Sequence, residues 1–281
     1  MKRIVLLLAA LSLAASACSA QLTDTPTPPP TEAPVLTEAP TDAPVVTETP
    51  VVTEPPGPAA NTVCSNLSFY LDPAIGSSIT CETIPASTIA METYPQYTKV
   101  TLQGYPLADK FFDPIIAIYP VSDYIALLPD VIPTRIAEMQ NLVAGGAPSG
   151  DGYPFLPTFN AAQIFHARGG LLPFLNGGGI RFLTEYAQYF APVNNTDLFY
   201  TYQGLTADGF YWISVILPIN HAILPADAIN PPGGMTWDTF AASYDTYIAG
   251  MIAQLEAQPA SSYIPSVDVL DALVNSIQVT P

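Results

Sequence analysis

The sequence predicts an α+β fold: a single domain with a mostly antiparallel sheet and helices packed on it, similar to an α/β/α sandwich. Three observations support this prediction. Strand-like apolar runs occupy 97–103 and 114–120, the segment 199–218 reads as a hairpin, and stretches with helical spacing lie on either side of the later strands. Runs of strands beside helices are typical of α+β domains. We place this domain at 62–281, because no second linker-like tract interrupts it.

The segment 1–17 has the three parts of an export signal, and a cysteine follows it directly. Lys2 and Arg3 give a positive start, a short apolar run follows, and small residues end it. This order resembles the lipobox of bacterial lipoproteins, in which the signal is cut before a cysteine that then carries lipid. The sequence therefore predicts a lipid anchor at Cys18. The alternative is an ordinary secretory signal cut near Ala17 or Ala20, with the cysteine incidental.

The segment 18–61 is rich in proline and threonine, and "TEAP" occurs twice in it. Such a composition offers too little apolar surface to offset the entropy of ordering, and prolines favour an extended chain. We expect a disordered stalk that lifts the domain off a membrane. The predicted location is extracytoplasmic, with the protein held at the cell membrane through its lipid.

The charge and the cysteines of the chain limit the partners and metals that it can be expected to bind. The formal net charge of the chain is −17 at pH 7, which argues against nucleic-acid binding, because that function needs a basic face. With Cys18 assigned to lipid, Cys64 and Cys81 form an even pair, and export permits a disulfide between them. A zinc site is the competing explanation, but these two cysteines with only His166 and His221 do not match zinc spacing. We predict no metal and no cofactor.

The elements of the first half follow in order. The runs "NLSFYLD" and "SSITCETI" predict two strands joined by a turn at 73–76. The segment 97–103 alternates like a half-buried strand, and 114–120 is a continuous apolar run like a covered one. A helix follows, with Asp130 as its expected cap and Gly145 as its end. Its apolar positions recur at Ile132, Ile136, Met139 and Val143.

The second half contains more strands and then two helices. The glycine groups "GG" and "NGGG" between short β-rich runs predict hairpin turns, and Asp208-Gly209 predicts the turn of the clearest hairpin. An amphipathic helix is expected over 236–258, beginning at an N-cap Thr236. Ser266 is expected to cap a short helix, and "SIQVT" to return as a final strand. The stripe expected along one side of the long helix is Trp237, Phe240, Tyr244, Tyr247, Ile248, Met251 and Leu255.

Several phrases carry a family resemblance. "PFLPTFNAAQIFHA", "GIRFLTEYAQ", "LFYTYQGLTADGFYWISVILP" and "LDALVNSIQV" resemble a set of uncharacterised bacterial secreted lipoproteins that share this phrase order after a Thr/Pro-rich stalk. The resemblance spans most of 91–281 and implies no activity. The element order also resembles, more loosely, the PsbP-like α/β/α sandwich, which would imply an accessory or assembly subunit.

Catalytic signatures are missing from the sequence. There is no G-x-S-x-G elbow, phosphate-binding loop or dinucleotide fingerprint, and no spacing singles out a carboxylate pair. We therefore expect a domain that is not an enzyme. The alternative is an extracytoplasmic hydrolase that uses His166 or His221 with a nearby acid.

The aromatic hairpin supplies the candidate binding face. Exposed Tyr and Trp side chains beside a few polar groups suit sugars, peptides or small amphiphiles, although the same aromatics also fit ordinary packing under the helices. We predict a domain that binds a ligand or a protein partner, with an accessory subunit of a membrane complex as a further alternative. The candidate residues are His166, Arg181, Glu185, Tyr200, Tyr202 and Trp212.

Overall fold

The computed structural model describes residues 58–90, 92–148 and 152–280, all within one compact unit. Its largest element is a seven-stranded sheet in the order β3-β6-β7-β13-β12-β10-β9, in which every pairing is antiparallel. The predicted leader, the predicted lipid anchor Cys18 and most of the predicted stalk lie outside the described residues. The strands of this sheet are β3 (Ser78–Ile84), β6 (Tyr97–Gln103), β7 (Ile115–Pro120), β9 (Ala167–Phe174), β10 (Gly177–Thr184), β12 (Phe199–Thr206) and β13 (Tyr211–Pro218).

Three smaller sheets complete the β structure. The first joins the start and the end of the described chain, because β2 pairs with both β1 and β14. The strands of these sheets are β1 (Thr62–Cys64), β2 (Leu67–Phe69) and β14 (Gln278–Val279), then β4 (Ser87–Ile89) with β5 (Glu92–Tyr94), and β8 (Ala162–Gln163) with β11 (Tyr186–Ala187).

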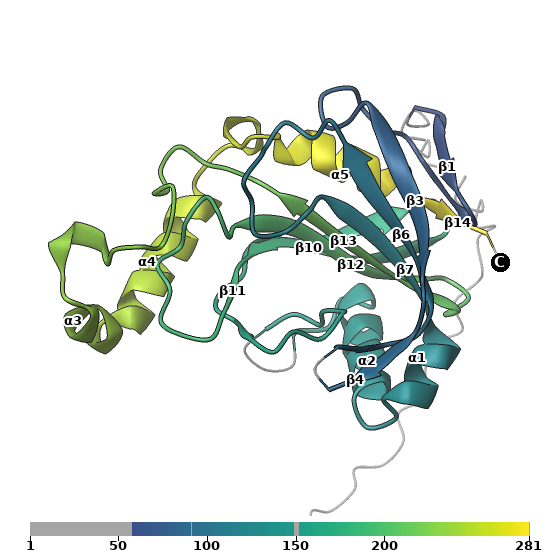
Figure 1. Ribbon diagram of the computed structural model, residues 1–281, viewed down its shortest axis with the longest axis horizontal. Helices are drawn as coiled ribbons and strands as arrows, with labels where there is room; N and C mark the ends of the chain where they lie inside the picture. The colour runs from purple at the N-terminus through teal and green to yellow at the C-terminus, as the bar shows by residue number, and fades with distance from the viewer. Residues whose placement is uncertain (1–57, 91, 149–151, 281) are drawn as a thin grey trace, which may run out of the picture. The chain divides into compact units, whose positions relative to one another are not determined.

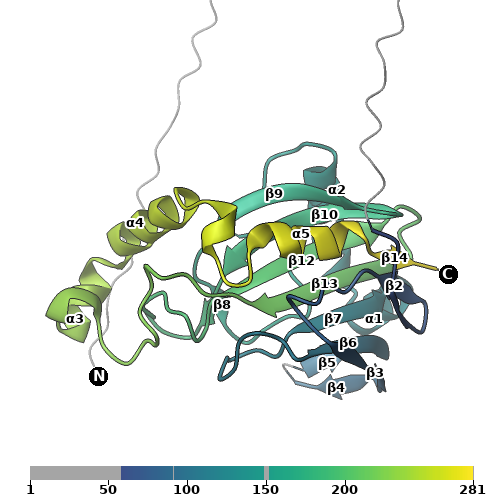
Figure 2. The ribbon, with the colours of Figure 1, turned by 90° about the horizontal axis from the view of Figure 1, so that it is seen from above.

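The helices cover both faces of the main sheet. Figure 1 shows α5 on one side of the strands, with α1 and α2 on the other. Figure 2 shows α4 continuing from the α5 side toward α3. No helix of the described residues has the length and apolarity to span a bilayer. The bounds are α1 (Val121–Leu127), α2 (Ile132–Val143), α3 (Trp237–Ala242), α4 (Tyr244–Glu256) and α5 (Val267–Asn275), with short 3-10 turns at Pro232–Gly234 and Ala260–Ser262.

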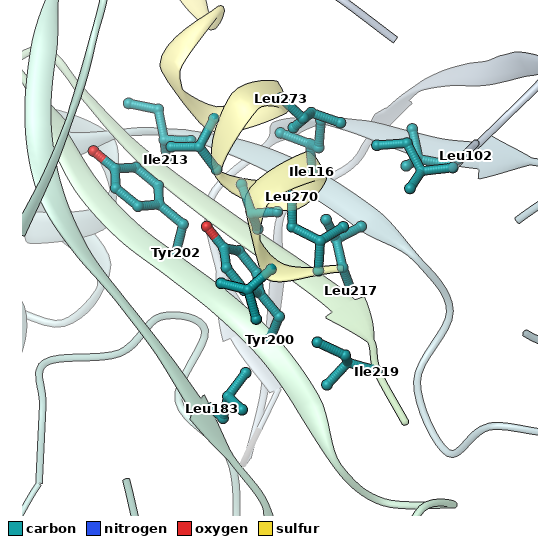
Figure 3. Packing of buried hydrophobic residues seen from close by; sticks show 14 of the residues in the cluster. Leu102, Ile116, Leu183, Tyr200, Tyr202, Ile213, Leu217, Ile219, Leu270 and Leu273 are labelled. Carbon is teal, nitrogen blue, oxygen red and sulfur yellow. The ribbon is translucent and has the colours of Figure 1, made fainter. Parts of the chain in front are cut away.

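The two covered faces contain two hydrophobic clusters. Tyr200 and Tyr202 of β12 pack with Leu270 and Leu273 on the α5 side, as Figure 3 shows. Trp212 of β13 belongs to the second cluster, on the α1–α2 side, while its neighbour Ile213 belongs to the first. Neighbouring residues of a strand point to opposite faces of the sheet, so one hairpin contributes to both clusters. All eight residues of β12 are buried, as expected for a central strand that has helices on both of its sides.

A disulfide links the small terminal sheet to the main sheet. Cys64 of β1 and Cys81 of β3 are bonded across 17 positions of sequence, with their Cα atoms 5.7 Å apart. The predicted disulfide is confirmed. The bond joins two sheets that the chain also connects directly, through the segment between β2 and β3.

Most expected strands and helix ends are confirmed, including the turn at Gly209, which has a φ of 76°. Thr236 and Ser266 both cap their helices, accepting from the third residue beyond each. The expected cap at Asp130 is wrong, because α2 has Val131 as its N-cap and no side-chain cap bond. Gly145 does follow the end of α2, with a φ of 86°.

Two other expectations are corrected. The long helix over 236–258 is broken in two, because Ser243 leaves the helical conformation at φ −113° and ψ 11°. The glycine pair 169–170 lies inside β9 and makes no turn. Gly170 stands opposite Arg181 in the register, and a Cβ there would lie 3.5 Å from the guanidinium carbon. That distance is an ordinary contact, whereas a Cβ at Gly169 would lie 2.7 Å from the Tyr153 hydroxyl oxygen.

Candidate functional site

The aromatic part of the predicted binding face is core. Tyr200 and Tyr202 are fully buried and Trp212 is 1% exposed. The two tyrosines face α5, while the indole lies on the opposite side of the sheet and donates from Nε1 to Oε1 of Gln203 at 2.8 Å. The prediction of an exposed aromatic face on this hairpin is therefore wrong, because helices cover both sides of the two strands.

Arg181 belongs to a structural link between the sheet and α5. Its Nε lies 3.3 Å from Oδ1 of Asp271, and the Tyr200 hydroxyl donates to the same oxygen at 2.8 Å. Burial raises the pKa of the Asp271 carboxyl, and the nearby guanidinium opposes that rise. The predicted binding residue Arg181 is thus occupied in holding a helix to the sheet.

His166 lies apart from the aromatic hairpin. Its ring packs against Tyr153 with the ring centroids 4.4 Å apart. Burial lowers the pKa of this histidine, and the charge of Glu256 opposes the shift. These contacts are those of a packed histidine at the edge of the sheet.

His221 has a serine within hydrogen-bond distance, the first requirement of the hydrolase alternative. Its Nε2 lies 2.9 Å from Oγ of Ser262. However, Nδ1 accepts from the backbone N–H of Ile223 at 3.2 Å, so the neutral ring carries its proton on Nε2 and donates to the serine. The Ser262 hydroxyl donates in turn to the carbonyl of Pro259 at 2.7 Å. A general base would have to accept the proton of Ser262, whereas here His221 donates a hydrogen bond to the serine oxygen.

Glu185 has the most unusual environment of the six predicted residues. It follows the last residue of β10 and is only 1% exposed. Its Oε1 accepts from the backbone N–H of Asn194 at 2.7 Å, while Oε2 has no hydrogen-bond partner among the described residues. Burial raises the pKa of this carboxyl well above its ordinary value, the Asn194 bond opposes the rise, and the charge of Asp197 adds to it. A buried polar atom left unpaired costs stability, so its retention needs an explanation.

A cavity of about 570 Å³ adjoins this carboxyl group. Glu185 and Asp197 line it together with aromatic rings and two amide side chains, and no Lys or Arg is among the lining residues. The rings come from the loop between β6 and β7, from the segment before β8, and from β11 and the loop after it. They are Phe111, Phe112, Phe159, Tyr186 and Tyr189.

The aromatic walls pack against one another. Phe112 stacks on Phe159 with centroids 5.3 Å apart, and Tyr186 meets Phe159 edge-on at 4.9 Å. Phe111 is 69% exposed and Tyr189 is 57% exposed. The buried carboxyl of Glu185 therefore marks the inner end of the cavity, and the two exposed rings mark its mouth.

The turn before β12 holds the two acids in place. Oδ1 of Asn194 accepts from the backbone N–H groups of Thr196 and Asp197, and its Nδ2 donates to Oδ2 of Asp197 at 2.8 Å. One asparagine thus binds both carboxyl groups, through its backbone to Glu185 and through its side chain to Asp197. The sequence "NNTD" is the local pattern that makes this turn possible.

Two tyrosines of α4 fix the preceding loop. The hydroxyl of Tyr244 donates to the carbonyl of Ala191 at 3.0 Å, and the hydroxyl of Tyr247 accepts from the backbone N–H of Val193 at 2.9 Å. Since both loop residues are buried, α4 holds the loop firmly against the body of the domain. The stripe of aromatics expected on the long helix therefore serves to position the candidate site.

A larger cavity of about 770 Å³ lies at the other end of the sheet, beside the β9–β10 turn and the end of α2. Leu171, Leu175 and Val143 line it and are exposed. Val143, the last of the apolar positions that recur along α2, lines this cavity. The lining includes no buried side-chain atom that lacks a partner, so this cavity gives less indication of a ligand than the one at Glu185.

The described residues contain no cluster of three or more His, Cys, Asp or Glu that could hold a metal ion. Comparison with protein-family models, with curated proteins and with solved structures finds no match to this chain.

Sequence reasoning named Glu185 but grouped it with the wrong neighbours. Its true neighbours, Asp197 and the five rings, come from loops that are far apart along the chain. The available signal was the occurrence of aromatic pairs in polar loops, at Phe111-Phe112 and Tyr189-Phe190. Large apolar side chains in such loops are candidates for a binding surface.

Proposed function

We propose that this protein is a lipoprotein of the cell envelope, anchored through Cys18, whose domain binds a small ligand without catalysis in the cavity at Glu185. The observation that carries the proposal is the unpaired Oε2 of Glu185 at the inner end of an aromatic-walled cavity. Ligand sites are typically apolar clefts with a few polar groups that fix orientation, and the volume of this cavity falls in their usual range.

The leader, the cysteine and the Pro/Thr-rich tract support the location. Mass spectrometry of the N-terminus of the native protein tests it: a chain that begins at Cys18 with acyl groups is expected. A chain that begins elsewhere, or an unmodified thiol, would remove the anchor from the proposal.

Ligand binding is tested with the full chain purified in detergent. Saturation-transfer NMR is recorded with three probes that share a phenyl ring on a short chain and differ in the charge of the terminal group. They are 2-phenylethanol, phenethylamine and 3-phenylpropionate. At least one probe is expected to bind the wild type and to be lost in Ala161→Phe, which places a ring in the cavity lined by Ala161. If no probe binds, or if the variant binds equally well, the cavity is not a ligand site.

The hydrolase alternative makes a different demand. It needs Ser262 to lose its proton to His221, against the hydrogen-bond polarity described above. A Ser262→Ala variant that abolished a measured esterase activity of the full chain would favour the hydrolase over the binding protein.

A further inference from the structure

The lining of the Glu185 cavity selects one class of ligand by charge. We propose that the cavity binds an organic ammonium ion, with the cationic nitrogen between Glu185 and Asp197 and its carbon skeleton against the aromatic walls. This inference rests on the proposed function, because it concerns the same cavity, and it adds the chemistry of the ligand.

The acidic groups are the first support. Two carboxyl groups line the cavity and no basic residue does. The nearest lysine in sequence to the walls, Lys110, donates to the carbonyl of Asn195 and to Oδ1 of Asn220, so its ammonium group is already occupied by those two oxygens. Once the Glu185 carboxyl is ionised, an ammonium ligand supplies the hydrogen-bond donor that its Oε2 lacks.

The aromatic walls are the second support. The faces of Phe and Tyr rings attract cations through their negative quadrupole, and the attraction is greatest where water is excluded. Phe159 and Tyr186 meet edge-on at 4.9 Å, so they present two differently oriented walls to one space. An anionic ligand would instead face the carboxylate of Asp197, and Lys110, the lysine whose charge acts on Asp197, already donates to two other oxygens.

The burial of Glu185 argues against a bulky neutral ligand such as a sugar ring. Glu185 is 1% exposed and its Oε2 is buried, so a rigid ring could not be brought against this oxygen. The partly exposed Asp197 lies on the same cavity and supplies an earlier contact. A formal charge of −17 also concentrates cations near the protein.

Binding is expected to release a proton. Burial holds the Glu185 carboxyl protonated above its ordinary pKa. When an ammonium ion enters, the neutral acid becomes a carboxylate paired with the cation, and its proton passes to solvent. Calorimetry in two buffers with different ionisation enthalpies measures this release directly.

The test compares phenethylamine with 2-phenylethanol, which differ only in the terminal group. The full-length wild type is expected to prefer the amine by about tenfold or more, which corresponds to ~1.4 kcal/mol. Glu185→Gln is expected to remove that preference, while the exposed control Glu92→Gln keeps it. The amine should release up to one proton per ligand from the wild type and none from Glu185→Gln.

Three outcomes would overturn this inference, and the first of them leaves the proposed function standing. If both probes bind with equal affinity, and Ala161→Phe abolishes the binding of both, the ammonium preference is overturned. The cavity would then still be a ligand site. Binding of no probe would overturn both. A preference for the amine that persists in Glu185→Gln would also overturn the inference, because it would not come from this carboxyl group.

Discussion

Replacing Glu185 by glutamine should change how the stability of the protein depends on pH. The buried carboxyl keeps its proton in the folded protein above its ordinary pKa of 4.5, whereas the unfolded chain has lost it. The folded state then binds more protons than the unfolded state, so the free energy of unfolding falls as pH rises. The stabilisation is complete below pH 4.5 and is lost as pH rises through the folded-state pKa.

The size of this effect follows from linkage. One group contributes a slope of at most ~1.4 kcal/mol per pH unit between the two pKa values. Glutamine has the same shape and can still accept from Asn194, but it has no proton to lose. Burial also raises the pKa of Asp271 and lowers those of His166 and His221, but these effects are present in both proteins and cancel in the difference.

The assay is urea denaturation at pH values from 5 to 8, roughly the range in which proteins are most stable, followed by the fluorescence of the buried Trp212. The wild type should lose stability relative to Glu185→Gln as pH rises. Glu92→Gln, an exposed change of the same kind, should run parallel to the wild type. If the wild-type and Glu185→Gln curves were parallel too, the carboxyl would not be held protonated by burial and the reasoning would be refuted.

Three further predictions concern the fold, and denaturant midpoints at constant pH measure each. Replacing both Cys64 and Cys81 by alanine should cost about 3 kcal/mol, since the bond closes a loop across 17 positions; an unchanged midpoint would contradict this. Met139→Ala should cost about 2–5 kcal/mol, because this side chain of α2 is fully buried, and a loss below 1 kcal/mol would count against that packing. Tyr200→Phe should cost about 1.5–3 kcal/mol through the lost bond to Asp271, whereas no loss would show the bond to be dispensable.

Local patterns predicted most of the fold correctly. The alternation in 97–103, the hairpin turn at Gly209 and the caps at Thr236 and Ser266 depend on nearby residues, and all are confirmed. The errors arose where distant contacts decide the structure. The glycine pair 169–170 reads as a turn until β9 is paired with β10 along its length.

The candidate site was predictable only in part, for a similar reason. Aromatic residues at alternate positions identify two sides of a hairpin, but the sequence does not reveal whether helices cover one side or both. Tyr200 and Trp212 therefore appeared available for binding and are buried. Asp197 and Phe159 reach Glu185 through the packing of loops, which no spacing in the sequence encodes.

The carboxyl carbon of Glu185 offers the most direct test of the account. In ¹³C NMR of the full chain, its signal is identified as the one missing from Glu185→Gln, and its titration is followed with and without phenethylamine. The account predicts a midpoint well above that of an ordinary glutamate, which falls when the amine is added. An ordinary midpoint, or one that the amine leaves unchanged, would contradict the assignment of this buried acid as the ammonium-binding end of the cavity.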